Sequence, residues 1–431
     1  MVIVRISYTD IANSPIQKPR VHVHALWVDW DKVYKAYDGK RCSAELDLMG
    51  QINILSNAKI VKTLNVLLIG ISKCNLACNY CYCRHEQMQI MDVKSFITIF
   101  NKLNRYFASD VEFHLVFHGG EPLLLGKSFY RVVFSFLKGQ QRAFHTSIQT
   151  NLTLLDEEFM SIFTANNCTV GTSIDGSKLM HDTNRIYKDG RGTYDDVLRA
   201  VNALEADEAP FGGFVVTLND TNIASAENLY DSLRCFRGAS IGFSIVFKST
   251  DTSETILDSE QLGGFLVDLF DIWVHDDSPL RLTFFENIIR NCLGINLCPE
   301  CTFSKQCADN FLAINALGDV FTCCDFEGMQ KFSYGNILSS DFQDIWESPI
   351  RRALLDRLSK RTISQECCEC EHFDICNSGC MAKTTRGFSD RDCYCFAYRM
   401  LFSHIRGQLP ALIACTHRIS EALAGDEMKN I

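Results

Sequence analysis

Three closely spaced cysteines constrain this chain more than any other feature. Cys74, Cys78 and Cys81 form a C-x3-C-x2-C pattern directly after an apolar run at residues 64–71. The run predicts a buried strand, so the cysteines are expected on a loop at its C-terminal end. A cubane iron–sulfur cluster normally takes four thiolates, so three cysteines would leave one iron open to another ligand. The alternative is a structural zinc site, for which only Cys83 lies near enough to be the fourth ligand.

The high cysteine content favours metal binding in a reducing compartment. The chain has 431 residues, 21 cysteines and a formal net charge of −10. Its first residues, MVIVRISYTD, lack the features of a signal peptide, and no apolar run approaches the about 18 residues that span a bilayer. We therefore expect a cytoplasmic protein with no membrane partner and with metal-binding cysteines. The acidic net charge implies no broad basic surface for a nucleic acid, so we expect no nucleic-acid partner.

Strands and helices alternate from residue 64 to about residue 246, which predicts a parallel sheet with crossover helices. Six strands are expected, at residues 64–71, 113–117, 144–148, 170–174, 214–218 and 241–246. Asp92 is expected to cap the first helix. That helix has apolar residues at a 3.6-residue period: Phe96, Ile99, Phe100, Leu103 and Phe107. In barrels of parallel strands the site lies where the strands end, so motifs after the strands are candidates for binding.

Polar motifs follow three of the predicted strands. FHGGEP, with Gly119, Gly120 and Glu121, follows the second strand. The glycines permit close approach of a ligand to the backbone, and the carboxylate can accept a hydrogen bond from an ammonium group. QTN follows the third strand, and SIDG, with Ser173, ends the fourth before the runs HDTNR and GRGTY. An ordinary turn would also explain GGEP, and a surface or interdomain salt bridge would explain Arg185 of HDTNR.

The cysteine loop and GGEP together resemble the signature of the radical S-adenosylmethionine (SAM) enzymes. The pattern is C-x3-C-x-aromatic-C, with Tyr80 as the aromatic residue at the cofactor. The resemblance implies an α/β fold with a partial (β/α)6 barrel of the TIM type, in which the open iron binds SAM. It places residues 119–121 at the amino group of SAM. The later runs resemble the subgroup of anaerobic sulfatase-maturating enzymes and peptide maturases, which implies that Ser173 and Arg185 lie near the ribose and carboxylate of SAM.

Cysteines recur in the C-terminal half, around a predicted hairpin at residues 311–323 and then in a C-x2-C-x5-C-x3-C pattern. This arrangement resembles the SPASM extension, a cysteine-rich domain that binds two auxiliary 4Fe-4S clusters. The resemblance implies eight ligands: Cys301, Cys307, Cys323 and Cys380 for the first cluster, and Cys367, Cys370, Cys376 and Cys395 for the second. Cys395 is preferred over Cys393 because it ends a D-x-Y-C run before a predicted helix. Cys298, Cys324 and Cys368 lie close enough in sequence to compete.

Asp325, in the run CCDF, is the candidate base. Sulfatase-maturating relatives are expected to use an aspartate directly after the corresponding cysteine, but here Cys324 shifts the aspartate by one position. Negative neighbours would raise its carboxyl pKa, which suits a base, whereas the alternative role is a loop cap.

Four regions are expected: an N-terminal extension of unknown role (1–63), the barrel (64–285), the SPASM domain (286–408) and a C-terminal helix or tail (409–431).

The resemblance implies an oxygen-sensitive radical SAM oxidoreductase with SAM and three 4Fe-4S clusters. An electron from the first cluster would cleave SAM to a 5′-deoxyadenosyl radical, and the auxiliary clusters would take up the electron that the substrate loses. An external donor such as flavodoxin or ferredoxin would supply the first electron. The favoured function is crosslinking of a side chain in a ribosomally made precursor peptide. The alternatives are a formylglycine-forming sulfatase maturase, a peptide epimerase, and a non-catalytic iron–sulfur electron-transfer protein.

Overall fold

The computed structural model describes residues 63–81, 88–247, 257–292, 301–304, 307–359, 364–384 and 391–409. Apart from Thr63 and Leu409, the predicted N-terminal extension and C-terminal tail lie outside these residues, as do Cys83 and Cys298. Residues Val61–Ser403 form one compact unit, whose fold follows. Within the described part of the chain, no helix is both long and apolar enough to cross a membrane.

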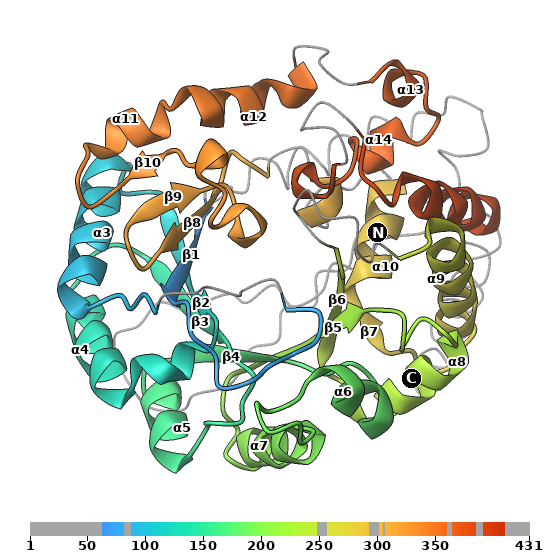
Figure 1. Ribbon diagram of the computed structural model, residues 1–431, viewed down its shortest axis with the longest axis horizontal. Helices are drawn as coiled ribbons and strands as arrows, with labels where there is room; N and C mark the ends of the chain where they lie inside the picture. Colours follow the sequence, from blue (N-terminus) through green and yellow to red (C-terminus); the bar gives the residue numbers. More distant parts are fainter. Residues whose placement is uncertain are drawn as a thin grey trace, which may run out of the picture. The chain divides into compact units, whose positions relative to one another are not determined.

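Ten strands of the described residues form one sheet, in the order β10-β9-β8-β1-β2-β3-β4-β5-β6-β7 (Figure 1). Its six long parallel strands are those predicted: β1 (Thr63–Ile71), β2 (Glu112–Gly119), β3 (Phe144–Gln149), β4 (Cys168–Ser173), β5 (Phe211–Leu218) and β6 (Ser240–Ile245). The α/β barrel fold is therefore confirmed. It brings the C-terminal ends of these strands, and the motifs that follow them, to one edge.

Helices connect the strands and cover the outer face of the sheet (Figure 1). They are α3 (Val93–Tyr106), η1 (Pro122–Leu125), α4 (Lys127–Lys138), α5 (Glu157–Thr164), α6 (Lys178–Asn184), α7 (Tyr194–Ala206), α8 (Ala226–Leu233), η2 (Arg234–Phe236), α9 (Ser259–Val274) and α10 (Thr283–Cys292). Asp92 caps α3 as predicted, because its Oδ1 accepts a hydrogen bond from the Ser95 amide at 2.7 Å. The apolar face of α3 packs on outward residues of β2, with the Phe96 and Phe117 rings 6.2 Å apart.

The hairpin predicted at the first auxiliary ligands extends this sheet. It consists of β8 (Phe311–Asn315) and β9 (Asp319–Phe321), and β8 pairs in parallel with β1. The sheet therefore crosses the predicted boundary between barrel and SPASM domain, which the sequence did not indicate. Two short strands, β7 (Arg281–Leu282) and β10 (Gly335–Asn336), were also not predicted. The other C-terminal elements are η3 (Cys301–Phe303), η4 (Cys324–Phe326), η5 (Gln330–Phe332), α11 (Phe342–Trp346), α12 (Pro349–Ser359), α13 (Gln365–Cys368), α14 (Phe373–Cys376) and η6 (Met381–Lys383).

A cavity of about 670 Å³ lies along the inner face of β2 to β6. Small residues alternate with outward apolar ones on these strands, and many of them line the cavity: Ser147, Thr169, Gly171, Gly213, Ser240 and Gly242. Such residues leave the lumen of the barrel open. The cavity reaches Gln149, the last residue of β3, and so extends toward the edge that carries the motifs.

Candidate active site

The loop after β1 carries the three predicted ligands of the first cluster, Cys74, Cys78 and Cys81. Backbone hydrogen bonds of 2.8 and 2.9 Å tie Ala77 to Ile186 and Asn79 to Asn184, at the C-terminal end of α6. Burial raises the pKa of Cys74 to about 11 and also raises the pKa of Cys78. Without metal these thiols are therefore protonated at neutral pH, and bound iron would supply the positive charge that favours thiolates.

The two glycines of GGEP allow the chain to pass directly against the cysteine loop. A Cβ at Gly120 would lie 2.3 Å from the Lys73 carbonyl oxygen. One at Gly119, where φ is +135°, would lie 2.4 Å from the Ile71 oxygen. The Gly120 amide donates to the Ile71 carbonyl at 2.8 Å, and the Glu121 amide donates to the Lys73 carbonyl at 3.0 Å. The close approach predicted for a ligand is thus made by the protein's own backbone.

Glu121 is fully buried and links the ends of β2 and β3. Its Oε1 accepts hydrogen bonds from the Leu123 amide at 2.9 Å and the Thr150 hydroxyl at 2.7 Å, and its Oε2 accepts one from the Asn151 amide at 2.8 Å. Burial raises the carboxyl pKa to about 7, although these hydrogen bonds lower it. Each carboxylate oxygen has two lone pairs, so Oε2 keeps capacity for another donor. Binding of the SAM amino group by Glu121 remains a prediction.

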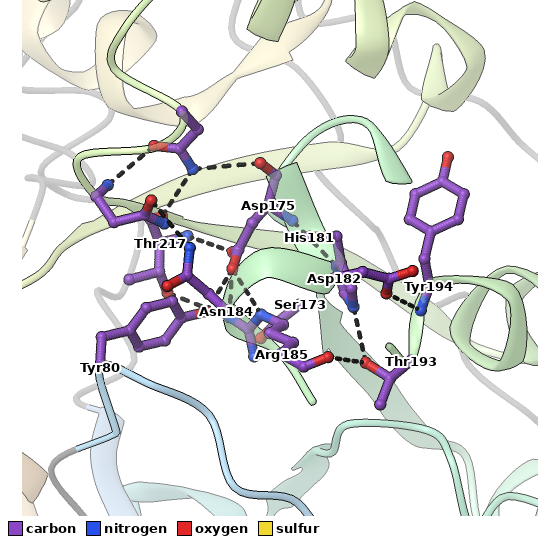
Figure 2. Close-up of polar contacts among 12 residues, drawn as sticks. Tyr80, Ser173, Asp175, His181, Asp182, Asn184, Arg185, Thr193, Tyr194 and Thr217 are labelled. Carbon is purple, nitrogen blue, oxygen red and sulfur yellow. Dashed lines mark hydrogen bonds and ion pairs between the residues drawn. The ribbon is translucent and has the colours of Figure 1, made fainter. Parts of the chain in front are cut away.

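Asp175, in SIDG, is a buried carboxylate at the centre of this edge, and the sequence did not single it out (Figure 2). Its Oδ2 accepts hydrogen bonds from the Tyr80 hydroxyl and from Arg185 Nε at 2.9 Å. Its Oδ1 accepts hydrogen bonds from the Thr217 amide at 3.0 Å and from Arg185 Nη2 at 3.3 Å. Asp175 therefore joins the cysteine loop to β4, β5 and the end of α6. The sequence signal was a carboxylate directly after a buried strand.

Arg185 forms a salt bridge with Asp175, but the pair is buried within the barrel, whereas the alternative predicted a surface or interdomain pair. Its guanidinium lies 5.4 Å from the centroid of the Tyr80 ring. Burial lowers the pKa of Arg185, but Asp175, Tyr80 and Cys78 raise it above its ordinary value. The cation is therefore permanent and lies close to the cysteine loop. Ser173 accepts a hydrogen bond from Gln149 Nε2 at 3.3 Å, and contact of Ser173 or Arg185 with SAM remains a prediction.

HDTNR and GRGTY support the Asp175–Arg185 pair (Figure 2). The buried His181 accepts a hydrogen bond from the Asp175 amide on Nδ1 at 3.4 Å, so its proton lies on Nε2, 3.0 Å from the Thr193 hydroxyl. That hydroxyl donates to the Arg185 carbonyl at 2.9 Å. Burial, together with the charge of Arg185, lowers the pKa of His181 to about 4, so the ring is neutral. These motifs hold the salt bridge in place.

The four predicted ligands of the second auxiliary cluster line one cavity: Cys367, Cys370, Cys376 and Cys395. Cys393 does not line it. Its amide instead donates a hydrogen bond to the Lys383 carbonyl at 2.8 Å, and burial raises the pKa of its thiol to about 12, with Asp392 and Cys380 contributing. The chain turns between the two sites at residues 377–379, all of which have positive φ. The geometry thus favours Cys395, as the sequence did.

The predicted ligands of the first auxiliary cluster gather around Cys323, just after β9. Burial raises the pKa of Cys323, and Asp325, Cys324, Cys380 and Cys301 raise it further through their charge. Cys307 and Cys323 both raise the pKa of Tyr334 through their charge. Such crowding of thiols suits a cubane, whose irons would neutralise the thiolates. In the described part of the chain, no three candidate ligands converge on a single metal ion, as zinc would require.

Asp325 lies beside this group, on η4, with its Oδ1 4.0 Å from Cys324 Sγ. Burial raises its carboxyl pKa, while the charge of Lys383 lowers it. The direction agrees with the sequence prediction, but the main cause is burial rather than negative neighbours. A raised pKa makes the Asp325 carboxylate a stronger base than an exposed aspartate, which suits a general base.

Two comparisons establish the class of this protein. Residues 68–233 match the radical SAM superfamily, and residues 289–371 match the SPASM iron–sulfur cluster-binding domain. The chain is therefore a radical SAM enzyme with a C-terminal SPASM domain, and its cofactors are SAM and iron–sulfur clusters.

Within that class, the chain is similar to anaerobic sulfatase-maturating enzymes. It is 27% identical to the serine-type enzyme of Bacteroides thetaiotaomicron, over 77% of this chain and 86% of the relative. It is 24% identical to the cysteine-type enzyme of Clostridium novyi, over 79% and 95%. The structure of anSMEcpe with bound AdoMet and a Kp18Cys peptide shares the fold, with a TM-score of 0.73 and 23% identity over 83% and 99%. Streptococcus suis SuiB bound to its precursor peptide SuiA also shares it, with a TM-score of 0.58 and 15% identity over 83% and 82%.

Proposed function

We propose that this protein oxidises a cysteine or serine side chain of a peptide substrate to formylglycine. The observation that carries the proposal is the similarity to sulfatase-maturating enzymes of both types across most of the chain. Asp325, beside the first auxiliary ligands, supports it. Formylglycine formation, which the sequence analysis gave as an alternative, is therefore preferred over crosslinking as the proposed function.

The proposal assigns three clusters to the cysteines of this chain. Cys74, Cys78 and Cys81 would hold the cluster that binds SAM, and the remaining eight predicted cysteines would hold two auxiliary clusters. When bound, these cofactors supply a radical that abstracts hydrogen and an acceptor for one electron. The Asp175–Arg185 pair would keep the cysteine loop in position through Tyr80.

Asp325 would accept the proton that the substrate loses as it is oxidised. An external donor such as flavodoxin or ferredoxin would supply the reducing electron.

Three peptides that differ at one position test the proposal. The reconstituted protein is incubated without oxygen with SAM, dithionite and a sulfatase peptide carrying Cys, Ser or Ala at the target position. We expect an aldehyde, trapped by a hydrazide and located by mass spectrometry, on the Cys or the Ser peptide but not on the Ala peptide. Asp325→Asn should still form 5′-deoxyadenosine but little aldehyde. Formation of 5′-deoxyadenosine with no aldehyde on any peptide would refute the proposal.

Crosslinking of a precursor peptide is the second candidate, and Cys324 favours it. This residue separates Asp325 from Cys323, so the base differs in position from that expected in sulfatase-maturating relatives. A crosslinked peptide loses two hydrogens, keeps every heavy atom and gives no fragment ions across the linked segment. That result, with an unchanged sulfatase peptide, would establish crosslinking instead.

A further inference from the structure

Lys383 is a buried cation that the proposed chemistry leaves unused. It lies on η6, three residues after Cys380, and only 8% of the residue is exposed. Lysine is rarely buried to this degree unless it is paired. Among the described residues, none gives the Lys383 ammonium a hydrogen bond or an ion pair. Its charge therefore needs compensation from a group other than a neighbouring carboxylate in direct contact.

The side chain lies where the SPASM segment meets the end of β6. Its Nζ is 5.5 Å from the centroid of the Phe247 ring, two residues beyond β6. Nearby, the Tyr394 hydroxyl donates to the Val246 carbonyl. The Lys383 carbonyl accepts a hydrogen bond from the Cys393 amide at 2.8 Å. The Lys383 amide also donates to the carbonyl of Cys380, a predicted cluster ligand, at 3.2 Å. These contacts fix the lysine between that ligand and the end of β6.

The ionisable groups that act most strongly on Lys383, among the described residues, are acidic. Burial lowers the pKa of Lys383, but Cys380, Asp392, Asp325 and Cys393 raise it above its ordinary value. Asp392 is already engaged, because its Oδ2 accepts from the Cys380 amide and its Oδ1 from the Tyr394 amide, both at 2.9 Å. The anionic centre still to be compensated is the one that forms when the thiols around Cys380 bind iron as thiolates.

We propose that Lys383 is the fixed counter-charge of the first auxiliary cluster and raises its reduction potential. The net charge around a cluster is one of the factors that set its potential. A reduced cluster carries one more negative charge than an oxidised one, so a buried cation stabilises the reduced form. Lys383 is thus a positioning residue that favours electron uptake by this cluster. The inference rests on the part of the proposed function that assigns Cys301, Cys307, Cys323 and Cys380 to one cluster.

Four variants of the reconstituted protein test this role: Lys383→Met, Lys383→Gln, Lys383→Arg and, as a matched control, Lys331→Met. Lys331 is exposed, and its Nζ lies 5.2 Å from the Phe332 ring, so the control removes a similar lysine–ring contact. Potentials are measured by redox titration with electron paramagnetic resonance, without peptide. We expect both neutral variants to lower the reduction potential of one auxiliary cluster by about 59 mV, which is about a tenfold change in the equilibrium constant for one-electron reduction. Lys383→Arg and Lys331→Met should keep the wild-type potentials.

Unchanged potentials in Lys383→Met and Lys383→Gln, with full iron content, would overturn the proposal. Loss of about four irons from the neutral variants alone would support the proposal, because the arginine variant keeps the charge. The same loss from Lys383→Arg would show a packing role and overturn it. Because no peptide is present, a wild type that forms no aldehyde would refute the proposed function without affecting this result.

Discussion

Replacing Asp175 by asparagine tests whether one buried carboxylate holds the functional edge together. The Asp175 side chain is fully buried and that of Arg185 is 12% exposed. Asparagine keeps nearly the same shape and can still accept the hydrogen bond from the Thr217 amide. It removes the negative charge, however, and leaves the Arg185 cation buried without a partner.

The structure sets the expected size of this effect. Asp175 accepts two charge-assisted hydrogen bonds from Arg185, 2.9 and 3.3 Å long. Each contributes about 1.5–3 kcal/mol to the stability of the fold, and the variant would lose this contribution. Breaking a buried ion pair by removing one partner typically costs about 3–5 kcal/mol, which agrees. The surface pair of Asp189 and Arg191 has the same 2.9 Å separation, but its side chains are 58% and 69% exposed. Because solvent screens this pair, Asp189→Asn should have little effect on stability.

Both variants would be unfolded in urea under anaerobic conditions and followed by tryptophan fluorescence. We expect Asp175→Asn to lower the midpoint by about 1 M and Asp189→Asn to leave it nearly unchanged. Asp175→Asn should also lose iron from the SAM-binding cluster, because the Tyr80 hydroxyl loses its charged acceptor. Adding Arg185→Gln should recover part of the lost stability, since the unpaired cation is then absent. Equal midpoints for the two single variants would refute the reasoning.

Three further predictions concern the cluster and SAM sites. Gly120→Ala should remove about four of about twelve irons, because the Lys73 carbonyl blocks its Cβ; Gly264→Ala, with nothing within 4 Å, should remove none. Cys395→Ala should abolish the spectroscopic signal of the second auxiliary cluster and Cys393→Ala should not; the opposite pattern would reverse the ligand assignment. Glu121→Gln should weaken SAM binding about tenfold or more, measured by equilibrium dialysis. Because burial raises the Glu121 pKa to about 7, wild-type affinity should fall as the pH drops through 7, and the variant should lack this dependence.

Features set by neighbouring residues could be predicted from the sequence. The cap of α3 at Asp92 and the apolar period behind it involve residues within one or two helical turns. The six long strands show the short apolar runs that buried parallel strands require. The spacing of Cys74, Cys78 and Cys81 likewise indicated a cluster loop, because a loop between close cysteines needs no distant partner.

The partners of Asp175, by contrast, were decided by the tertiary structure. Tyr80 lies 95 residues from it in the chain and Thr217 lies 42 residues away. No local pattern identifies such partners, so SIDG was assigned through Ser173 alone. The pairing of β8 with β1 joins Phe311 to Asn65, and nothing in either strand specifies the other.

The sequence by itself determined which segments form the six long strands and the helices between them, because these depend on short-range periodicity. Its assignment of cysteines to cluster loops, from their spacing, remains a prediction. Tertiary structure alone decided which charges are buried together. Lys383 is a polar residue in the sequence, whereas in the fold it is a buried cation with no ion-pair partner among the residues that the structure describes. Desolvation and Coulomb energy depend on neighbours from distant segments, such as Phe247 and Asp325, and these become neighbours only when the chain is folded.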